Sequence, residues 1–201
     1  PKKILQQEKS TSAVVFYWGI KKKFPNLDVH NIFFSDQYEE EFRKMFKEGS
    51  LSSDPTIYIH VSSKMEEDDA PEYGENWFVM VNAPINTGQD WGNMRTLLRK
   101  NILSKLSRIL NEDIESLIEV EHFTDPVKME KMYSGLQGSI YGNSSNSKMS
   151  AFYRHPNFSK EIKGLYFAGV TVHPGGGIPL ALNSAKIIEQ CIIKDFKLNQ
   201  R

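Results

Sequence analysis

The glycine-rich segment 164–179 is the part of the sequence best suited to binding a cofactor. Its apolar start, residues 165–167, predicts a buried strand, and Gly169 predicts a sharp exit from a sheet with a neighbouring group close by. Glycines 175–177 predict a turn that a ligand can approach, followed by a helix over residues 180–189. A helix start without side chains presents free N–H groups and a positive dipole end to an anionic or electron-rich ligand. By spacing alone, a ligand site and a simple chain reversal both stay open.

The sequence does not indicate phosphate-loop or hydrolytic chemistry. The glycines match neither GxGxxG nor a loop followed by Lys-Ser/Thr, and the second glycine group, at 135–138, also lacks the required spacing. No GxSxG occurs, so a nucleophilic serine is not supported. Cys191 lies in the apolar pattern of residues 187–192, which predicts a buried small hydrophobic side chain.

The histidines do not indicate a metal site, because they are scattered and occur without HExxH or a cysteine partner. The five of them are His30, His60, His122, His155 and His173. His173 precedes a proline, so it is either an acid–base group or part of a turn. We therefore predict no metal and assign no catalytic residue.

The glycine-rich segment resembles the C-terminal signature of bacterial-type phytoene desaturases, a family of FAD-dependent carotenoid desaturases. The matching motifs are Gly-Leu-Tyr-Phe-Ala-Gly, His-Pro-Gly-Gly-Gly-Ile-Pro and Leu-Asn-Ser-Ala-Lys, all between residues 164 and 186. Upstream segments fall in the order expected of the same family, at residues 30–36, 54–58 and 75–81. The resemblance covers residues 13–193 and is specific for the family, not for one carotenoid.

This resemblance implies a mixed α/β (α+β) fold that is the C-terminal part of a two-domain FAD-linked oxidoreductase. Residues 1–150 would hold a mixed or antiparallel substrate-domain sheet with helices, and residues 151–201 the last strand and helix of the FAD domain. Because the family opens with a GxGxxG unit that this chain lacks, we expect a longer parent flavoprotein and an inactive chain by itself. The resemblance places Gly169 and Val170 toward the ribityl and pyrophosphate groups of FAD. The residues that it places toward the isoalloxazine ring are Gly176, Gly177, Ile178 and Pro179.

Composition restricts the partners and the compartment. The 201 residues are 39% hydrophobic, and the 25 basic and 25 acidic residues balance, so nucleic acid is not expected. One cysteine fits a reducing compartment, and neither an 18-residue apolar run nor a secretory signal occurs. We expect a cytoplasmic protein, with a peripheral contact at the inner membrane face as the alternative to a plainly solvated basic surface. The chain starts at Pro1 without Met, so a preceding segment is expected.

Several segments have clear local patterns. Residues 12–19 predict a strand, and Ser35 predicts the cap of a helix that runs to Lys47 and stops at Gly49. Residues 56–62 and 77–81 predict two antiparallel strands. Such a pair would have a heavily apolar face, which suits an elongated polyene.

The second half predicts a helix over residues 94–110, a strand over 114–123, a helix start at Asp125-Pro126 and a loop over 133–148. The expected apolar side of the long helix contains Met94, Leu97, Leu98, Ile102, Leu106, Ile109 and Leu110. Its expected basic side contains Arg95, Arg99, Lys100, Lys105 and Arg108.

Two classes of function follow. The first is desaturation of a C30–C40 polyene, as the resemblance implies, with hydroxylated carotenoids, saturation or isomerisation as close variants. The second is a non-catalytic domain that binds an apolar ligand or a partner. In either case the helix after Gly169 is expected to expose apolar surface, with a second copy of the chain as a possible cover.

Overall fold

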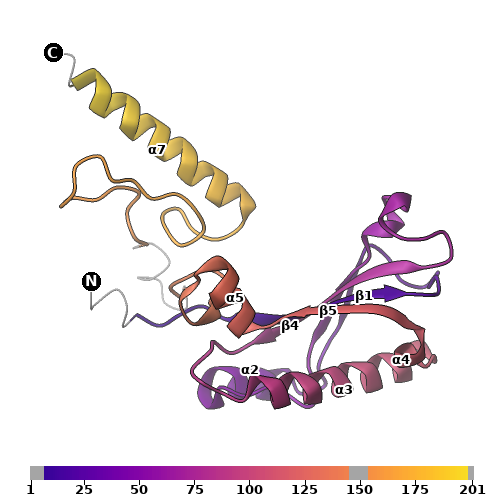
Figure 1. Cartoon of the computed structure of the whole chain (residues 1–201). Helices are drawn as coiled ribbons and strands as arrows, with labels where there is room; N and C mark the ends of the chain where they lie inside the picture. The colour runs from indigo at the N-terminus through magenta and orange to yellow at the C-terminus, as the bar shows by residue number, and fades with distance from the viewer. Residues whose placement is uncertain (1–6, 145–153, 199–201) are drawn as a thin grey trace. The chain divides into compact units, whose positions relative to one another are not determined.

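The computed structural model describes residues 7–144 and 154–198, drawn in colour in Figure 1. Two compact units are present: Thr11–Gly138, and a second unit formed by Pro1–Ser10 with Ser139–Arg201. The sequence-based boundary at residue 150 falls among residues outside the described part. It stays a prediction.

An antiparallel sheet of five strands organises the unit Thr11–Gly138. The strand order is β2 (His30–Phe33), β3 (Ile57–His60), β4 (Glu75–Ala83), β1 (Ser12–Ile20) and β5 (Ile118–Thr124). The predicted antiparallel pairing of residues 56–62 with residues 77–81 is confirmed, since Ile59 lies opposite Val79 across the ladder. Strand β1 lies between β4 and β5, so the first strand of the chain is central.

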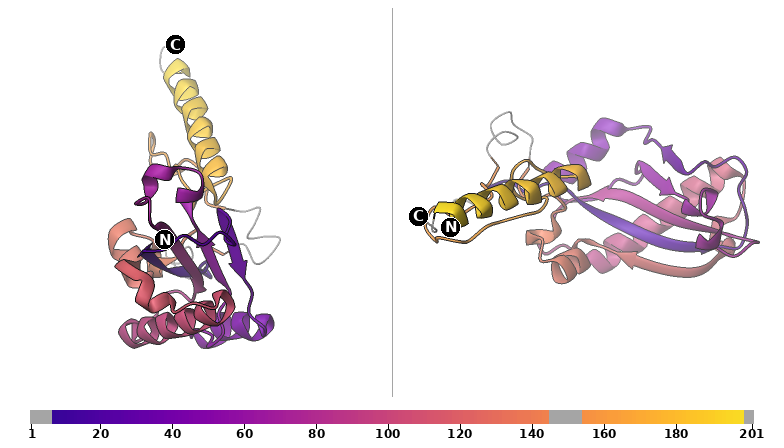
Figure 2. Two further views of the ribbon diagram at one scale, coloured as in Figure 1. Left: turned by 90° about the vertical axis from the view of Figure 1, so that its right-hand side faces the viewer. Right: turned by 90° about the horizontal axis from the view of Figure 1, so that it is seen from above.

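One face of the sheet is the hydrophobic core. Alternate residues of the central strands are fully buried there, among them Phe16, Trp18 and Trp77. Helix α3 (Trp91–Leu110) packs on this face through Leu98, Ile102 and other residues of one stripe. Figure 2 shows the strands lying in front of α3 when the molecule is seen from above.

Helix α3 begins three residues before its predicted start, because the Asp90 side chain accepts a hydrogen bond from the Asn93 N–H at 3.1 Å. Its predicted apolar side needs correction. Leu97 is turned away from the buried stripe and Ile109 lies in the last turn, so both are exposed. Lys105, predicted on the basic side, is instead buried.

The predicted helix after Ser35 is shorter at its start. Helix α2 covers Tyr38–Arg43 and continues as a π-helical turn over Lys44–Glu48. Ser35 is not its cap, because the Ser35 Oγ accepts from the Gln37 N–H at 3.0 Å in a turn before the helix. The stop at Gly49 is confirmed, since that residue is left-handed with φ of 61°.

The predicted strand over 114–123 is wrong in its first turn. Residues Ile114–Leu117 form the short helix α4, whose N-cap, Asp113, accepts from the Ser116 N–H, and β5 begins only at Ile118. Helix α5 (Pro126–Tyr133) starts where predicted. The loop after it contains a 3-10 turn, Leu136–Gly138, and its residues 145–148 lie outside the described residues. Two further 3-10 turns, Ser62–Lys64 and Glu67–Asp69, follow β3.

Asp125 is expected to stabilise α5 through both carboxylate oxygens. One oxygen accepts from the Lys128 N–H at 2.9 Å, and the other pairs with Arg95 Nη1 at 2.8 Å. We expect Asp125→Ala to lower the free energy of unfolding by about 2–3 kcal/mol, because a cap and a buried pair are both lost. Asp125→Asn keeps a capping oxygen and is expected to cost about half as much. Urea unfolding followed by circular dichroism measures both, and equal losses would contradict the division between cap and charge.

The second unit contains helix α7 (Ile178–Leu198) and an irregular segment before it. The predicted buried strand over 165–167 is wrong. Tyr166 forms only an isolated antiparallel bridge with Phe158, and Leu165 is exposed. A strand needs neighbours along a ladder, and among the described residues this segment has only that bridge.

Candidate functional site

The glycine-rich segment adopts backbone angles that need glycine. Gly169, Gly175 and Gly177 have φ of 124°, 137° and 98°, which confirms the prediction of a turn closed to other residues. The expected close neighbour of Gly169 lies on its backbone side, where the Ser184 Oγ is 2.9 Å from the Gly169 nitrogen, whereas no described atom lies within 4 Å of its Cβ position. Gly176 is restricted by space instead, since a Cβ there would lie 2.4 Å from Tyr141 Cδ1.

Ser184 connects the glycine turn to α7. Its Oγ accepts from the Gly169 N–H at 2.9 Å and donates to the Ala181 carbonyl at 2.6 Å, and the side chain is fully buried. Sequence reasoning missed this residue as a support of the turn, although it lies in the Leu-Asn-Ser-Ala-Lys motif of the family signature. Its hydroxyl holds Gly169 close to the start of the helix.

Two further side chains hold the segment from its other side. Asn157, which is buried, donates to the carbonyls of Phe167 and His173, at 3.2 and 2.7 Å. Arg154 donates from Nη1 to the Val170 carbonyl at 3.1 Å. His173 is exposed, and its backbone N–H donates to the His155 carbonyl, which favours the turn interpretation over an acid–base role.

The six residues assigned to FAD by resemblance therefore lie along one supported segment. Gly169, Val170, Gly176 and Gly177 are partly exposed, and the first residues of α7, Ile178 and Pro179, are exposed. Helix α7 begins at Ile178, and its first intrahelical bond runs from the Ala181 N–H to the Gly177 carbonyl at 2.9 Å. The N–H groups before that bond lie outside the helical ladder and face away from it.

Helix α7 exposes a large apolar surface, as expected from the sequence. Ile178, Leu182 and Phe196 are 79%, 63% and 68% exposed. Cys191 is only partly buried, so its prediction as a core side chain is wrong. The reason is that the apolar pattern of residues 187–192 faces a side of α7 that the described residues cover incompletely. A hydrogen bond from the Tyr166 hydroxyl to the Asp195 carboxylate raises the pKa of Tyr166.

The second candidate surface is the face of the sheet opposite α3, here called the open face. The strand register places two rows of side chains on it. One row contains His30, His60, Phe78, Tyr17 and His122. The other contains Ile32, Tyr58, Met80, Val15 and Thr124.

The middle of the open face is aromatic and half-exposed. Tyr17 and Tyr58 each meet the Phe78 ring edge-on, with centroids 5.6 and 6.4 Å apart. Met80 lies beside them on β4 and is partly exposed. A row of aromatic and thioether side chains on a sheet surface suits a flat, apolar ligand, because such groups bind by area and by stacking.

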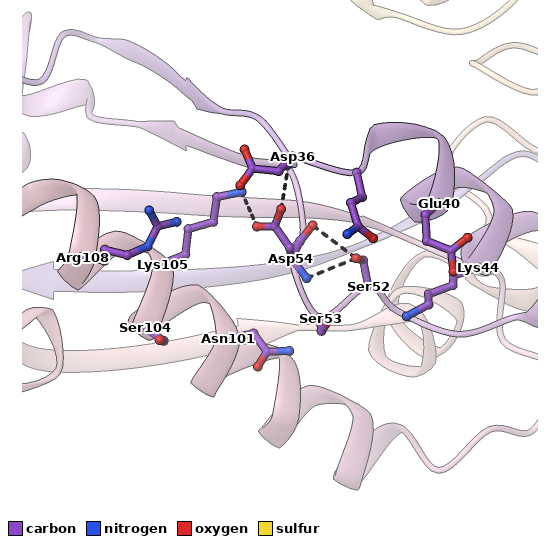
Figure 3. Close-up of a pocket in the computed structure, with 11 residues that line it drawn as sticks. Asp36, Glu40, Lys44, Ser52, Ser53, Asp54, Asn101, Ser104, Lys105 and Arg108 are labelled. Atoms are coloured by element: carbon purple, nitrogen blue, oxygen red, sulfur yellow. Dashed lines mark hydrogen bonds and ion pairs between the residues drawn. The ribbon is translucent and has the colours of Figure 1, made fainter.

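A polar pocket of about 360 Å³ lies between α2, α3 and the loop before β3. Figure 3 shows Lys105 reaching from α3 to Asp54, whose carboxylate also accepts from the Asp36 N–H. Glu40, on the opposite side, pairs with Arg43, and a hydrogen bond from that guanidinium lowers the pKa of Glu40. The carboxylates of Asp54 and Glu40 are already paired within the protein. We therefore interpret the residues that line this pocket as structural contacts between α2, α3 and the loop, and not as a ligand site.

Ion pairs also change the prediction of a basic helix face. Arg95 pairs with Asp125, Arg99 with Glu115 and Glu121, and Lys105 with Asp54. Much of the positive charge of α3 is therefore neutralised locally. Among residues 7–144 and 154–198 there is neither a helix long and apolar enough to cross a membrane nor a metal-binding group of His, Cys, Asp or Glu.

The described residues thus form a sheet with one packed and one open aromatic face, and a glycine turn followed by an exposed helix start. Comparison with known proteins shows which proteins the chain is related to. The chain is 54% identical to a 1-hydroxycarotenoid 3,4-desaturase of Flavobacterium sp. (strain P99-3), over 96% of this chain and 39% of the relative. It is 35% identical to a 4,4'-diapophytoene desaturase of Staphylococcus aureus (strain Newman), over 98% of this chain and 40% of the relative.

A phytoene desaturase of Fusarium fujikuroi is 31% identical, over 97% of this chain and 38% of the relative. No protein-family model matches the chain. The chain belongs to the carotenoid desaturase family, which confirms the resemblance identified from its motifs. It spans about two fifths of the length of these curated relatives.

Proposed function

We propose that this chain is the C-terminal portion of an FAD-dependent oxidoreductase that desaturates a carotenoid polyene. The observation that carries the proposal is the 54% identity to a 1-hydroxycarotenoid 3,4-desaturase, which extends over nearly the whole chain. On that basis the unit Thr11–Gly138 supplies part of a substrate domain, and the segment with α7 completes an FAD domain. A hydroxylated carotenoid is the substrate that this similarity favours.

The residues of the glycine segment fit a flavin. Gly169 and Gly177 have open space where a Cβ would stand, so a planar ring can approach their backbone closely. The N–H groups at the start of α7 lie outside the helical ladder, where a positive dipole end favours an electron-rich group. When bound, FAD would accept one of the two hydrogens removed from the polyene as a hydride, and the second hydrogen would leave as a proton.

The other tasks belong to the chain itself. The open face of the sheet provides the aromatic surface against which a polyene lies, and burial of apolar area drives that binding. Ser184 and Asn157 keep the glycine turn in one conformation, so the helix start does not reorganise when charge develops near it. No side chain is assigned as the acceptor of the proton that leaves with the hydride.

We further propose a cytoplasmic protein that meets the inner membrane face peripherally, since apolar polyenes dissolve in lipid. The exposed apolar side chains of α7, among them Leu182 and Phe196, support either a lipid contact or a homodimer contact.

The function is tested on the full-length protein with its upstream sequence. We expect the purified protein to show flavin absorbance, and we expect that absorbance to bleach anaerobically when a hydroxylated carotenoid is added. Flavin without bleaching by any polyene would favour a saturase or isomerase. A protein that binds polyene but holds no flavin would instead support a non-catalytic apolar-ligand domain.

Gly177→Val tests the cofactor assignment. A valine there fills the open space beside the helix start, and we expect flavin affinity to fall by about tenfold or more. Gly164→Val is the matched control, because Gly164 also has a positive φ, of 79°, and open space around its Cβ position. Gly164 is not among the residues assigned to FAD, which lie between residues 169 and 179. Flavin content is measured by absorbance after gel filtration. Equal losses in the two variants would attribute the effect to backbone strain and contradict the assignment.

A further inference from the structure

A small group of hydrogen-bonding side chains lies at the β2–β3 margin of the open face. His30 Nδ1 and the Tyr58 hydroxyl oxygen are 2.8 Å apart. The His60 ring stacks on His30 with centroids 5.0 Å apart, and His30 lies directly opposite His60 in the strand register. We call these three residues the margin cluster.

The margin cluster retains unused hydrogen-bonding capacity. One proton is shared between His30 Nδ1 and the Tyr58 hydroxyl, so with respect to the described residues the second nitrogen of His30 and a lone pair of the Tyr58 oxygen stay available. Neither ring nitrogen of His60 bonds a protein group within the described residues. The cluster therefore offers both a donor and an acceptor to a ligand on this face.

The surroundings of the cluster are apolar. Ile32 and Met80 flank Tyr58 in its row, and Phe78 flanks His60 in the other. Adjacent strands lie about 4.8 Å apart, so His30 lies about 14 Å across the sheet from Tyr17 in the aromatic middle. A polyene lying over the middle would thus reach the cluster with a part of the molecule distant from its centre.

We propose that the margin cluster binds the terminal hydroxyl of a hydroxylated polyene and makes the site selective for it. This inference rests on the proposed function. A pure hydrocarbon lying over the cluster would remove water from His30 and Tyr58 without replacing the lost hydrogen bonds, which is unfavourable. A hydroxyl both donates and accepts, so it satisfies the two free positions, and a site built to bond a hydroxyl discriminates strongly against an analogue without one.

The similar Flavobacterium protein gives this selectivity a chemical reason. Its name, 1-hydroxycarotenoid 3,4-desaturase, describes a substrate with a hydroxyl on carbon 1 and a reacting bond between carbons 3 and 4. Because carbon 1 is only two bonds from carbon 3, binding the hydroxyl on carbon 1 restricts the position of the bond between carbons 3 and 4. The margin cluster would therefore act as a positioning and selectivity element for the hydroxylated end of the substrate.

The test compares two polyenes that differ only in the 1-hydroxyl, using the full-length protein. For each we measure kcat/KM and, by quenching of tryptophan fluorescence, Kd. We expect the wild type to favour the hydroxylated polyene in both quantities. For the hydroxylated polyene, Tyr58→Phe is expected to lower both kcat/KM and affinity by about tenfold. For the hydrocarbon, the same variant is expected to change these values by less than about twofold.

Tyr133→Phe is the control, because it removes the same hydroxyl from an exposed ring of α5, outside the open face. His30→Ala is a second variant, expected to reproduce the loss of selectivity with an unchanged unfolding midpoint. Equal losses on both polyenes, or the same loss in Tyr133→Phe, would overturn the inference while leaving desaturation intact. Absence of turnover with either polyene would reject the proposed function, and the Kd values would still decide hydroxyl selectivity.

Discussion

Replacing Gly138 with alanine is expected to lower the free energy of unfolding by about 3–5 kcal/mol. A Cβ built on Gly138 lies 2.3 Å from the Pro126 carbonyl oxygen and 2.8 Å from its carbonyl carbon, and both are backbone atoms. Gly138 also has φ of 69°, and its own carbonyl accepts from the buried Ser12 hydroxyl at 2.6 Å. The turn cannot retreat without breaking that hydrogen bond, and α5 cannot move without disturbing its cap at Asp125.

Gly88→Ala separates the two causes. Gly88 has a positive φ of 101°, but no atom lies within 4 Å of its Cβ position, so only backbone strain of about 1 kcal/mol is expected. Both variants are compared by urea denaturation of the chain, followed by circular dichroism. Similar losses in the two would show that the contact with Pro126 relaxes without cost, contrary to our expectation.

Lys105→Met is expected to lower the free energy of unfolding by about 3 kcal/mol. The ammonium of Lys105 is buried and donates to Asp54 Oδ1 at 2.7 Å and to the carbonyls of Phe34 and Pro55 at 2.7 and 3.0 Å. Methionine fills a similar volume but leaves a carboxylate and two carbonyls without their donor. Lys100→Met, at an exposed position of the same helix, is the control and is expected to change stability by less than about 0.5 kcal/mol.

The same pair predicts a dependence of stability on pH. Burial tends to raise the pKa of Asp54, but hydrogen bonds from Lys105 and from the Asp36 N–H outweigh it and lower that pKa. A carboxyl with a lowered pKa in the folded state stabilises the protein above its unfolded value, near pH 4, and loses this contribution as pH falls further. Lys105→Met should therefore show a flatter loss of stability in acid. An unchanged acid profile would contradict a role for this pair.

These two predictions concern the support of the proposed site. Lys105 joins α3 to the loop that leads into β3, the strand that carries Tyr58 and His60. Gly138 allows the chain to pass close to the start of α5, just after β5. Loss of either is expected to disturb the edges of the sheet before its centre, because the central strands β1 and β4 are paired on both sides.

Local patterns in the sequence predicted much of the fold. The alternation in residues 56–62 follows from the two-residue repeat of a strand, and the register confirms the predicted antiparallel pairing of this segment with residues 77–81. Asp125-Pro126 predicted a helix start because a carboxylate and a fixed proline angle both suit one. The failures occurred where local signals competed, as at Ser35, whose hydroxyl bonds a turn instead of the helix start.

The sequence by itself determined the family, the antiparallel strands and the glycine turn, because each depends on residues close together in the chain. Only the tertiary structure placed Lys105 against Asp54, Ser184 under Gly169, and His30 beside Tyr58. Those contacts join segments that pair or pack only when the chain folds, and helical or strand periodicity does not specify which partner a side chain meets. The segment 165–167 shows the same limit, since an apolar run becomes a strand only where a neighbouring strand completes its hydrogen bonds.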